Sequence, residues 1–455
     1  MDLQSIDPRT GTVLRRFPET PPAEVAEVVA RCHAEFLRWR DRSIVERAAP
    51  MRRAARLVRE LRDELSTVIV EEMGKPITEA RAEIDKCAWV CEYYADHAER
   101  FLAREVIATD ASASFVAFRP LGVVLAVMPW NFPFWQVFRF AAPALMAGNG
   151  ALLKHASNVP ACALAIESLF REAGFPDDLF RSVLIGSARI DELLAHPAVV
   201  AATLTGSTPA GRAIASRAGA LLKKTVLELG GSDPYVVLED ADLDVAVPAC
   251  VAGRMINGGQ SCIAAKRFLV SAAVAPEFER RVVEAMAAKR MGDPMDDATE
   301  LGPMARRDLR DELHDQVARS ARLGARLVLG GEVPAGEGAY YPPTVLADVR
   351  PGMPAFDEET FGPVAAIVPC RDDDDAVRLA NATPFGLGAA VFTRESARGE
   401  AIAEHRLDAG CCFVNAFVRS DPRLPFGGVK ESGYGRELGP FGIREFVNVK
   451  TVWVR

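Results

Sequence analysis

Hydrophobic side chains recur at helical spacing over the first part of the chain. Residues 23–40 carry apolar positions at three- and four-residue intervals, directly after Pro21-Pro22. That stripe predicts an amphipathic helix that begins after the two prolines. Similar patterning continues to about residue 104, so we expect a helical N-terminal part.

From residue 123 onward, short continuous apolar runs alternate with helical stretches. Such runs are typical of buried parallel strands in an α/β sheet. The first series covers residues 123–127, 151–154, 199–205 and 225–229, and the second covers 235–238, 268–270, 326–329, 364–368, 388–393 and 411–414. The pattern predicts two α/β lobes that meet near Gly230-Gly231. Residues 446–454 also form a strand-like run, with little to pair with inside their own lobe, so we expect an edge strand suited to oligomerisation.

Composition and charge exclude several classes of protein. The net charge is −8, and the basic residues are scattered among the acidic ones, which argues against nucleic acid or an anionic membrane as partner. The polar first ten residues resemble no signal peptide, and no apolar run reaches the roughly 18 residues that a membrane span needs. We therefore expect a cytoplasmic protein.

The cysteines favour a reducing compartment. There are nine, an odd number, and they show neither CxxC nor Cys/His spacing, so we expect no disulfide framework and no bound metal. Residues 261 and 263 are Ser and Ile, so Cys262 has no neighbouring thiol for a vicinal disulfide. We expect Cys411 and Cys412 to lie along a strand, with side chains on opposite faces.

Cys262 is the first candidate for chemistry. It follows Gly258, Gly259, Gln260 and Ser261, so the backbone is free to turn tightly and present a thiol. A buried structural role stays open at this point, because one glycine-flanked cysteine is weak evidence for a nucleophile.

A second candidate segment follows the first apolar run. Asn131 comes at the carboxyl end of a predicted strand, where ligand groups collect in α/β sheets and where an amide could donate to an oxyanion. Steps of four residues reach Trp135 and Arg139, so a helix would put all three on one broad face. The alternative is that Trp135 packs in the core and Arg139 points to solvent.

Two further predicted strands end in residues suited to chemistry. Glu228 precedes Leu-Gly-Gly and could be a general base, or equally a helix cap or salt-bridge partner. Gly206 and Ser207 precede Pro209 at a predicted helix start, where backbone N–H groups bind phosphate well. The dinucleotide fingerprint GxGxxG is absent, and a plain cap at Ser207 or Thr208 is the rival interpretation.

Six motifs occur in a characteristic order along essentially the whole chain. They are Pro-Trp-Asn-Phe-Pro, Thr-Gly-Ser, Glu-Leu-Gly-Gly, Gly-Gln-Ser-Cys, Glu359-Thr-Phe-Gly-Pro and Pro425-Phe-Gly-Gly-Val-Lys-Glu-Ser-Gly-Tyr-Gly-Arg-Glu. In this the chain resembles the aldehyde dehydrogenase superfamily. It is most similar to the bacterial succinate-semialdehyde dehydrogenases, on the segments Phe134-Trp-Gln-Val-Phe-Arg-Phe, Lys154-His-Ala-Ser-Asn-Val-Pro and Phe441-Gly-Ile-Arg-Glu-Phe.

The resemblance implies a role for each matching residue. Cys262 would be the nucleophile and Glu228 the base, and Asn131 with the Cys262 backbone N–H would form the oxyanion hole. Attack on the aldehyde, hydride loss to a nicotinamide and hydrolysis of the resulting thioester would follow. The residues implied to bind the cofactor are Trp130, Lys154, Ser157, Gly186, Gly206, Ser207, Leu229, Glu359 and Phe361.

The resemblance also implies the domain organisation. We expect two Rossmann-like α/β lobes and a small β oligomerisation element. Residues 1–107 and 122–229 would form the cofactor domain, 230–416 the catalytic domain, and 108–121 with 437–455 the oligomerisation element of a homodimer or homotetramer.

Charge bears on the choice of cofactor. Many NAD-using relatives have an acid at the position of Ser157, which holds the ribose hydroxyls. An acid would repel a 2′-phosphate, whereas Ser157 can donate to it and Lys154 can neutralise it. We therefore expect NADP to be accepted and preferred, with NAD as the second cofactor.

Charge bears on the substrate as well. Arg139 would lie about 12 Å along a helix from Asn131, where a guanidinium at the mouth of an aldehyde tunnel would bind a terminal carboxylate. Related semialdehyde enzymes pair such an Arg with a Ser, for which Ser420 is the choice here, and Arg419 could contribute. Trp135 would wall the tunnel, and succinate semialdehyde is the expected substrate.

Three alternatives to this substrate assignment stay open on the sequence. The first is a dehydrogenase of uncharged aliphatic or aromatic aldehydes, and the second is a CoA-acylating relative, against which Glu228 argues. The third is a catalytically silent protein on the same fold, against which the presence of every catalytic residue type argues.

Overall fold

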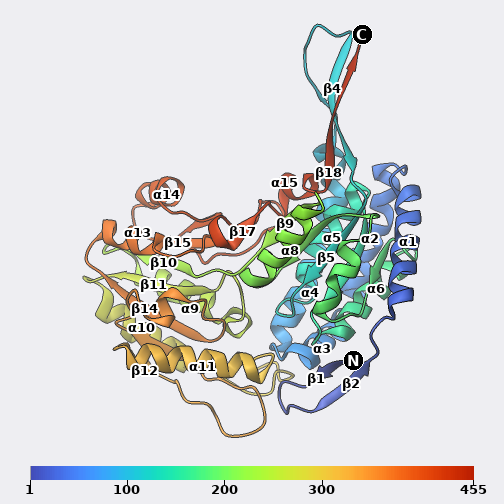
Figure 1. Cartoon of the computed structure of the whole chain (residues 1–455). Coiled ribbons are helices and arrows are strands. Elements are labelled where there is room, and N and C mark those ends of the chain that lie inside the picture. Colours follow the sequence, from blue (N-terminus) through green and yellow to red (C-terminus); the bar gives the residue numbers. More distant parts are fainter. Residues whose placement is uncertain (1) are drawn as a thin grey trace.

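The computed structural model describes residues 2–455, which form two sheet-centred lobes side by side (Figure 1). The first sheet has the strand order β17-β9-β8-β5-β6-β7, and all of its pairs except β17–β9 are parallel. Its strands are β5 (Val123–Met128), β6 (Gly150–His155), β7 (Phe180–Ser182), β8 (Val199–Thr205), β9 (Lys224–Glu228) and β17 (Gly433–Tyr434).

Helices cover both faces of this sheet, which is why its strands are apolar throughout. On β5, Val123 and Leu125 pack with α1, α7 and α8, whereas Val124 and Ala126 belong to the cluster formed with α2 to α6. The helices of this lobe are α1 (Pro22–Trp39), α2 (Ile44–Glu60), α3 (Arg62–Met73), α4 (Ile77–Phe101), α5 (Trp135–Ala147), α6 (Pro160–Glu172), η1 (Ser187–Arg189), α7 (Ile190–Leu194) and α8 (Thr208–Ala220).

The predicted helical N-terminal part is confirmed within its limits. Helix α1 begins one residue before the predicted start at residue 23, and α4 ends at Phe101. Ser43 and Glu46 form a reciprocal capping box that starts α2. A hairpin of β1 (Leu3–Ile6) and β2 (Val13–Phe17), which the hydrophobic pattern did not predict, precedes these helices.

The second lobe is built on a seven-stranded sheet of order β12-β13-β14-β11-β10-β15-β16. Its strands are β10 (Asp233–Val237), β11 (Ala265–Ser271), β12 (Arg326–Leu329), β13 (Thr344–Ala347), β14 (Val364–Cys370), β15 (Gly388–Phe392) and β16 (Cys411–Val414). Its helices are α9 (Leu243–Met255), η2 (Ile256–Gly259), α10 (Ala275–Ala287), α11 (Arg307–Arg322), α12 (Pro354–Asp357), α13 (Asp373–Asn381) and α14 (Ser396–His405). The predicted change of lobe near Gly230-Gly231 falls between β9 and β10.

One predicted strand of this lobe, β12, differs from the prediction in its pairing and its exposure. The run 326–329 was expected to be a buried parallel strand, but β12 pairs antiparallel with β13 at the edge of the sheet, and Arg326 and Leu327 are exposed. That expectation was wrong because a short apolar run does not distinguish an edge from a central strand. On β16, Cys411 and Cys412 pack against different core clusters, so their predicted opposite orientation is confirmed.

A three-stranded antiparallel sheet projects away from both lobes (Figure 1). It consists of β3 (Glu105–Val106), β4 (Ala113–Pro120) and β18 (Val447–Val454), with β4 in the middle. Residues 446–454 were expected to form an edge strand with little to pair with inside their own lobe, and this is confirmed, because β18 lies at the edge of the projecting sheet and pairs along its whole length with β4. The outer edge of β18 is exposed, and η3 (Lys430–Ser432) and α15 (Gly439–Arg444) lead up to it.

Candidate active site

Cys262 follows a tight left-handed turn. Residues 257–259 of η2 all have positive φ, of 55°, 59° and 75°. A Cβ atom on Gly259 would lie 2.1 Å from the carbonyl oxygen of Gly362, so only glycine fits at that position. The glycines before Cys262 therefore permit the tight turn that the sequence predicted.

Cys262 contributes to the walls of two cavities. The first, here called the Trp135 pocket, holds about 770 Å³, and the second, the Gly206 pocket, holds about 570 Å³. Only Cys262 and Gln136 belong to both linings. The Trp135 pocket is lined by Glu79, Ala82, Glu83, Lys86, Phe132, Trp135, Gln136, Arg139, Ile256, Ser261, Cys262, Ile263, Arg419, Ser420 and Phe426. The Gly206 pocket is lined by Pro129, Trp130, Asn131, Gln136, Thr205, Gly206, Ser207, Leu229, Gly230, Cys262, Glu359 and Phe361.

Asn131 lies in the loop between β5 and α5. Because α5 begins at Trp135, the predicted helical face that Asn131 shares with Trp135 and Arg139 was wrong. The side-chain oxygen of Asn131 accepts a hydrogen bond from Gln136 at 3.0 Å, so Nδ2 points the other way, to the Gln260 carbonyl at 3.0 Å. The Nδ2 group carries two protons, and the second is available to a ligand beside Cys262.

Glu228 ends strand β9 with a buried carboxyl group. Within residues 2–455 its two oxygens have no hydrogen-bond partner and it forms no ion pair, so neither the cap nor the salt-bridge interpretation applies. Burial, and after it the nearby Glu437, raises the pKa of Glu228 well above its usual value. The raised pKa favours the protonated form of the resting carboxyl, as suits a group that exchanges a proton during a reaction.

The Cys262 thiol is also neutral at rest. Burial raises its pKa to about 12, while Lys266 and then Arg139 act in the opposite direction. Lys266, on β11, donates to the Ser261 carbonyl at 2.7 Å and lies 3.5 Å from a carboxylate oxygen of Glu359. The sequence reasoning missed Lys266, which lies inside an apolar run with no local sign of a role.

The Gly206 pocket opens at the start of helix α8. Ser207 occupies the N-cap position, but its side chain makes no capping hydrogen bond. Thr208 instead contacts the Glu431 carbonyl at 3.4 Å, so the plain-cap interpretation holds for neither residue. An N-terminus of this kind provides backbone donors for a phosphate.

The lining of the Gly206 pocket also contains two aromatic rings and a carboxylate. Trp130 and Phe361 form an edge-to-face pair with centroids 5.8 Å apart. Glu359 accepts from the Gly231 backbone at 3.0 Å, and a Cβ atom on Gly230 would lie 2.4 Å from its other oxygen. Leu229 packs against α8 at Gly211 and also lines the pocket. Phosphate donors, aromatic faces and a carboxylate for ribose hydroxyls in one cavity fit a nicotinamide dinucleotide.

Lys154 and Ser157 lie at the carboxyl end of β6, in the same sheet as Gly206. Lys154 is buried, and burial lowers the pKa of its amine. Ser157 is exposed in the turn that follows. Gly186 lies after β7, close to Glu19, whose Oε1 would be 3.3 Å from a Cβ atom there. Lys154, Ser157 and Gly186 do not belong to the lining of the Gly206 pocket, and their role in binding the cofactor stays a prediction.

Arg139 lies in the wall of the Trp135 pocket, as the expected substrate site requires, but its guanidinium already has a partner there, and its role toward a carboxylate stays a prediction. Its guanidinium is buried, forms an ion pair with Glu437 and packs over the Phe426 ring at 4.8 Å. Its remaining polar contact is with Thr205 at 3.4 Å. The alternative that Arg139 points to solvent is wrong, since its side chain is buried in the wall of the Trp135 pocket. The partner Glu437 comes from a segment almost three hundred residues away, and spacing along α5 could not reveal it.

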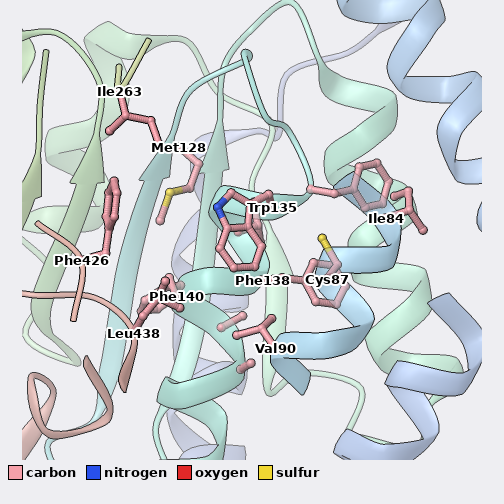
Figure 2. Close-up of a cluster of buried hydrophobic side chains, with 14 of the residues drawn as sticks. Ile84, Cys87, Val90, Met128, Trp135, Phe138, Phe140, Ile263, Phe426 and Leu438 are labelled. Carbon is pink, nitrogen blue, oxygen red and sulfur yellow. The ribbon is translucent and has the colours of Figure 1, made fainter. Parts of the chain in front are cut away.

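Trp135 and Ser420 both line the Trp135 pocket. Figure 2 shows Trp135 within a buried cluster, with Cys87 of α4 on one side and Phe426 and Ile263 on the other. Ser420 Oγ accepts a hydrogen bond from Lys86 at 2.7 Å. Lys86 was missed in the sequence, where it lies in a helical stretch interpreted as core packing.

Comparison with known proteins gives a consistent result. The model of the aldehyde dehydrogenase family matches residues 1–452. The chain is 50% identical to a probable succinate-semialdehyde dehydrogenase [NADP(+)] of Synechocystis, with all of both chains covered. It is 48% identical to the succinate semialdehyde dehydrogenase [NAD(P)+] Sad of Escherichia coli, over 99% of this chain and 97% of that one. A solved succinic semialdehyde dehydrogenase from Streptococcus pyogenes, in complex with NADP+, superposes with a TM-score of 0.97 at 36% identity and covers 99% of each chain.

Across residues 2–455, none of the helices combines the length and the apolar character that crossing a bilayer requires.

Proposed function

Because the chain belongs to the aldehyde dehydrogenase family, we propose that it oxidises succinate semialdehyde to succinate with NADP as its preferred cofactor. The observation that carries the proposal is the position of Cys262 in the walls of two different cavities. One cavity holds cationic and hydroxyl side chains suited to a carboxylate, and the other is suited to a dinucleotide.

In the proposed reaction the Cys262 thiol releases its proton to solvent, and the thiolate attacks the aldehyde carbon and forms a thiohemiacetal. The negative oxygen accepts hydrogen bonds from Asn131 Nδ2 and from the Cys262 backbone N–H. A nicotinamide cofactor, held by the lining of the Gly206 pocket, supplies the hydride acceptor that allows a thioester to form. Glu228, once ionised, takes a proton from water, which then hydrolyses the thioester and frees the sulfur.

The cofactor preference rests on Lys154 and Ser157. A buried ammonium and an exposed hydroxyl at the end of β6 can hold a 2′-phosphate, and no acid occupies position 157 to repel it. The relatives from Synechocystis and Escherichia coli carry NADP(+) and NAD(P)+ in their names, which supports the same preference. NAD is the proposed second cofactor.

The substrate proposal is tested with aldehydes that differ in one group. Succinate semialdehyde and butanal have the same chain length, but only the first carries a carboxylate. We expect kcat/KM with NADP to be at least about 100-fold higher for succinate semialdehyde, because a charge-assisted pair in a buried pocket contributes about 3 kcal/mol. Equal values for the two aldehydes would show instead a dehydrogenase of uncharged aldehydes.

A homodimer or homotetramer is proposed through the projecting sheet, and a cytoplasmic location with it. Val449 and Trp453 on β18 are exposed, and an exposed strand edge with apolar side chains favours pairing with a second copy. The nine cysteines, all free in the described chain, support a reducing compartment. Light scattering of Val449→Lys beside the unaltered protein tests the assembly, since a buried lysine should dissociate it.

A further inference from the structure

The Trp135 pocket contains three cationic side chains in different electrostatic states. Arg139 is already neutralised by its ion pair with Glu437. Arg419 is exposed, so water screens its charge. Lys86 is half-buried in the pocket wall, and among residues 2–455 no carboxylate lies within ion-pair distance of its amine.

We propose that Lys86, with Ser420, is the residue pair that binds the substrate's carboxylate and sets the preference for a charged aldehyde. The inference rests on the proposed function and deepens it, since it adds a residue of α4 to Arg139 and Ser420, the residues expected from the sequence, which line the same pocket.

The contacts of Lys86 leave it able to bind an anion. Its Nζ donates to Ser420 Oγ at 2.7 Å and lies 4.3 Å from the centroid of the Trp135 ring. An ammonium has three donors and only one is used here. Because Ser420 accepts from Lys86, its own hydroxyl proton is free to donate. The pair thus offers two or more donors from neighbouring atoms, which matches the two oxygens of a carboxylate.

The neighbouring acids are engaged elsewhere. Glu83 pairs with Lys75 and accepts from the Phe134 and Trp135 backbone, which starts helix α5. Asp421 pairs with Arg423 at 2.6 Å. The positive charge of Lys86 is therefore available to an incoming ligand.

The electrostatic surroundings favour the same assignment. Burial, followed by repulsion from Arg139, lowers the pKa of Lys86 to about 8, while the carboxylates of Glu83 and Asp421 and the Cys87 thiol act in the opposite direction. At neutral pH most of the amine is still protonated. A desolvated ammonium of this kind gains more from a carboxylate than an exposed one does.

The test compares three variants on two aldehydes. Lys86→Met removes the charge, Lys86→Gln keeps a donor for Ser420 without the charge, and Lys86→Arg keeps the charge. We expect Met and Gln to lower the ratio of kcat/KM for succinate semialdehyde to that for butanal at least about tenfold, mainly through KM, and Arg to restore part of it. Succinate as a dead-end inhibitor should also bind at least about tenfold more weakly to the Met and Gln variants.

Two outcomes separate this inference from the function that it rests on. A preference for succinate semialdehyde that survives in both Lys86→Met and Lys86→Gln overturns the role of Lys86 and leaves the proposed function intact. An unaltered enzyme without that preference overturns both. Lys289→Met is the matched control, because it removes the same charge from the surface, where Lys289 pairs with Glu300, and it should keep the ratio unchanged.

Discussion

The two pockets beside Cys262 are built in different ways. The Gly206 pocket is formed largely by strand ends, a helix start and glycines that admit a close backbone approach. The Trp135 pocket is formed mainly by residues of α4, α5 and the loop after β16, together with the segment around Cys262. Backbone-built recognition is hard to alter without breaking the fold, whereas side-chain recognition changes with single substitutions. The comparison teaches that specificity for the aldehyde and binding of the cofactor can vary independently here.

Replacing Cys262, which lines both pockets, should have the largest effect. Cys262→Ser keeps the size of the side chain but removes the nucleophilic thiol, so kcat should fall about 10⁴-fold or more for charged and uncharged aldehydes alike. Cofactor binding, followed by quenching of tryptophan fluorescence, should change little. Turnover close to that of the unaltered enzyme would refute the proposed covalent chemistry.

Removing Arg139 should damage the Trp135 pocket as a whole. Arg139→Ala leaves the Glu437 carboxylate buried and unpaired, which costs about 3–5 kcal/mol of folding stability. We expect a lower melting temperature in scanning fluorimetry and losses on both aldehydes. A loss confined to succinate semialdehyde, without a change in stability, would instead assign the carboxylate to Arg139.

A single acid at the far end of the cofactor site should shift the cofactor preference. Ser157→Glu places a carboxylate beside Lys154, where it repels a 2′-phosphate and can accept from ribose hydroxyls. The ratio of kcat/KM for NADP to that for NAD should fall about 10- to 100-fold. Because Ser157 is exposed, stability should stay the same, and Ser168→Glu on α6 provides a control. An unchanged ratio would mean that the 2′-phosphate lies elsewhere.

The dependence of kcat/KM on pH should differ between the two aldehydes, and this effect should be smaller than those of the substitutions above. Burial raises the pKa of Cys262, which attacks in deprotonated form, so kcat/KM should increase with pH by up to about tenfold per unit. Lys86 loses its charge above its pKa of about 8. The increase should therefore continue for butanal and level off for succinate semialdehyde above that pH. Parallel profiles for the two aldehydes would contradict the role of Lys86.

Much of the fold could be predicted from the hydrophobic pattern alone. The bounds of β8, β12 and β16 agree with the predicted runs, because short continuous apolar runs flanked by helices are typical of strands in an α/β sheet. The short strands β3, β7 and β17 were not predicted, since two or three residues carry no periodicity. The antiparallel pairing of β12 could not be predicted from the sequence either, because the direction of pairing depends on the neighbouring strand and not on the apolar run alone.

The candidate site was predictable where a motif is local. The turn before Cys262 needs its own glycines, and so the sequence indicates it directly. The ion pair of Arg139 with Glu437 and the contact of Lys86 with Ser420 join segments that only the folded chain brings together. A charged residue inside an amphipathic helix is usually solvated, which is why the pattern gave no reason to single out Lys86.

The pairing of β18 with β4 also bears on how the polypeptide is made. Ala113–Pro120 leaves the ribosome long before Val447–Val454, and during that interval β4 presents an open edge to other nascent chains. One edge of strand β9 likewise stays unpaired until β17 has been synthesised. Binding by chaperones during synthesis should therefore matter more for the yield of this protein than its final stability does. The strands β17 and β18 are synthesised late, and until then the unpaired strand edges can aggregate.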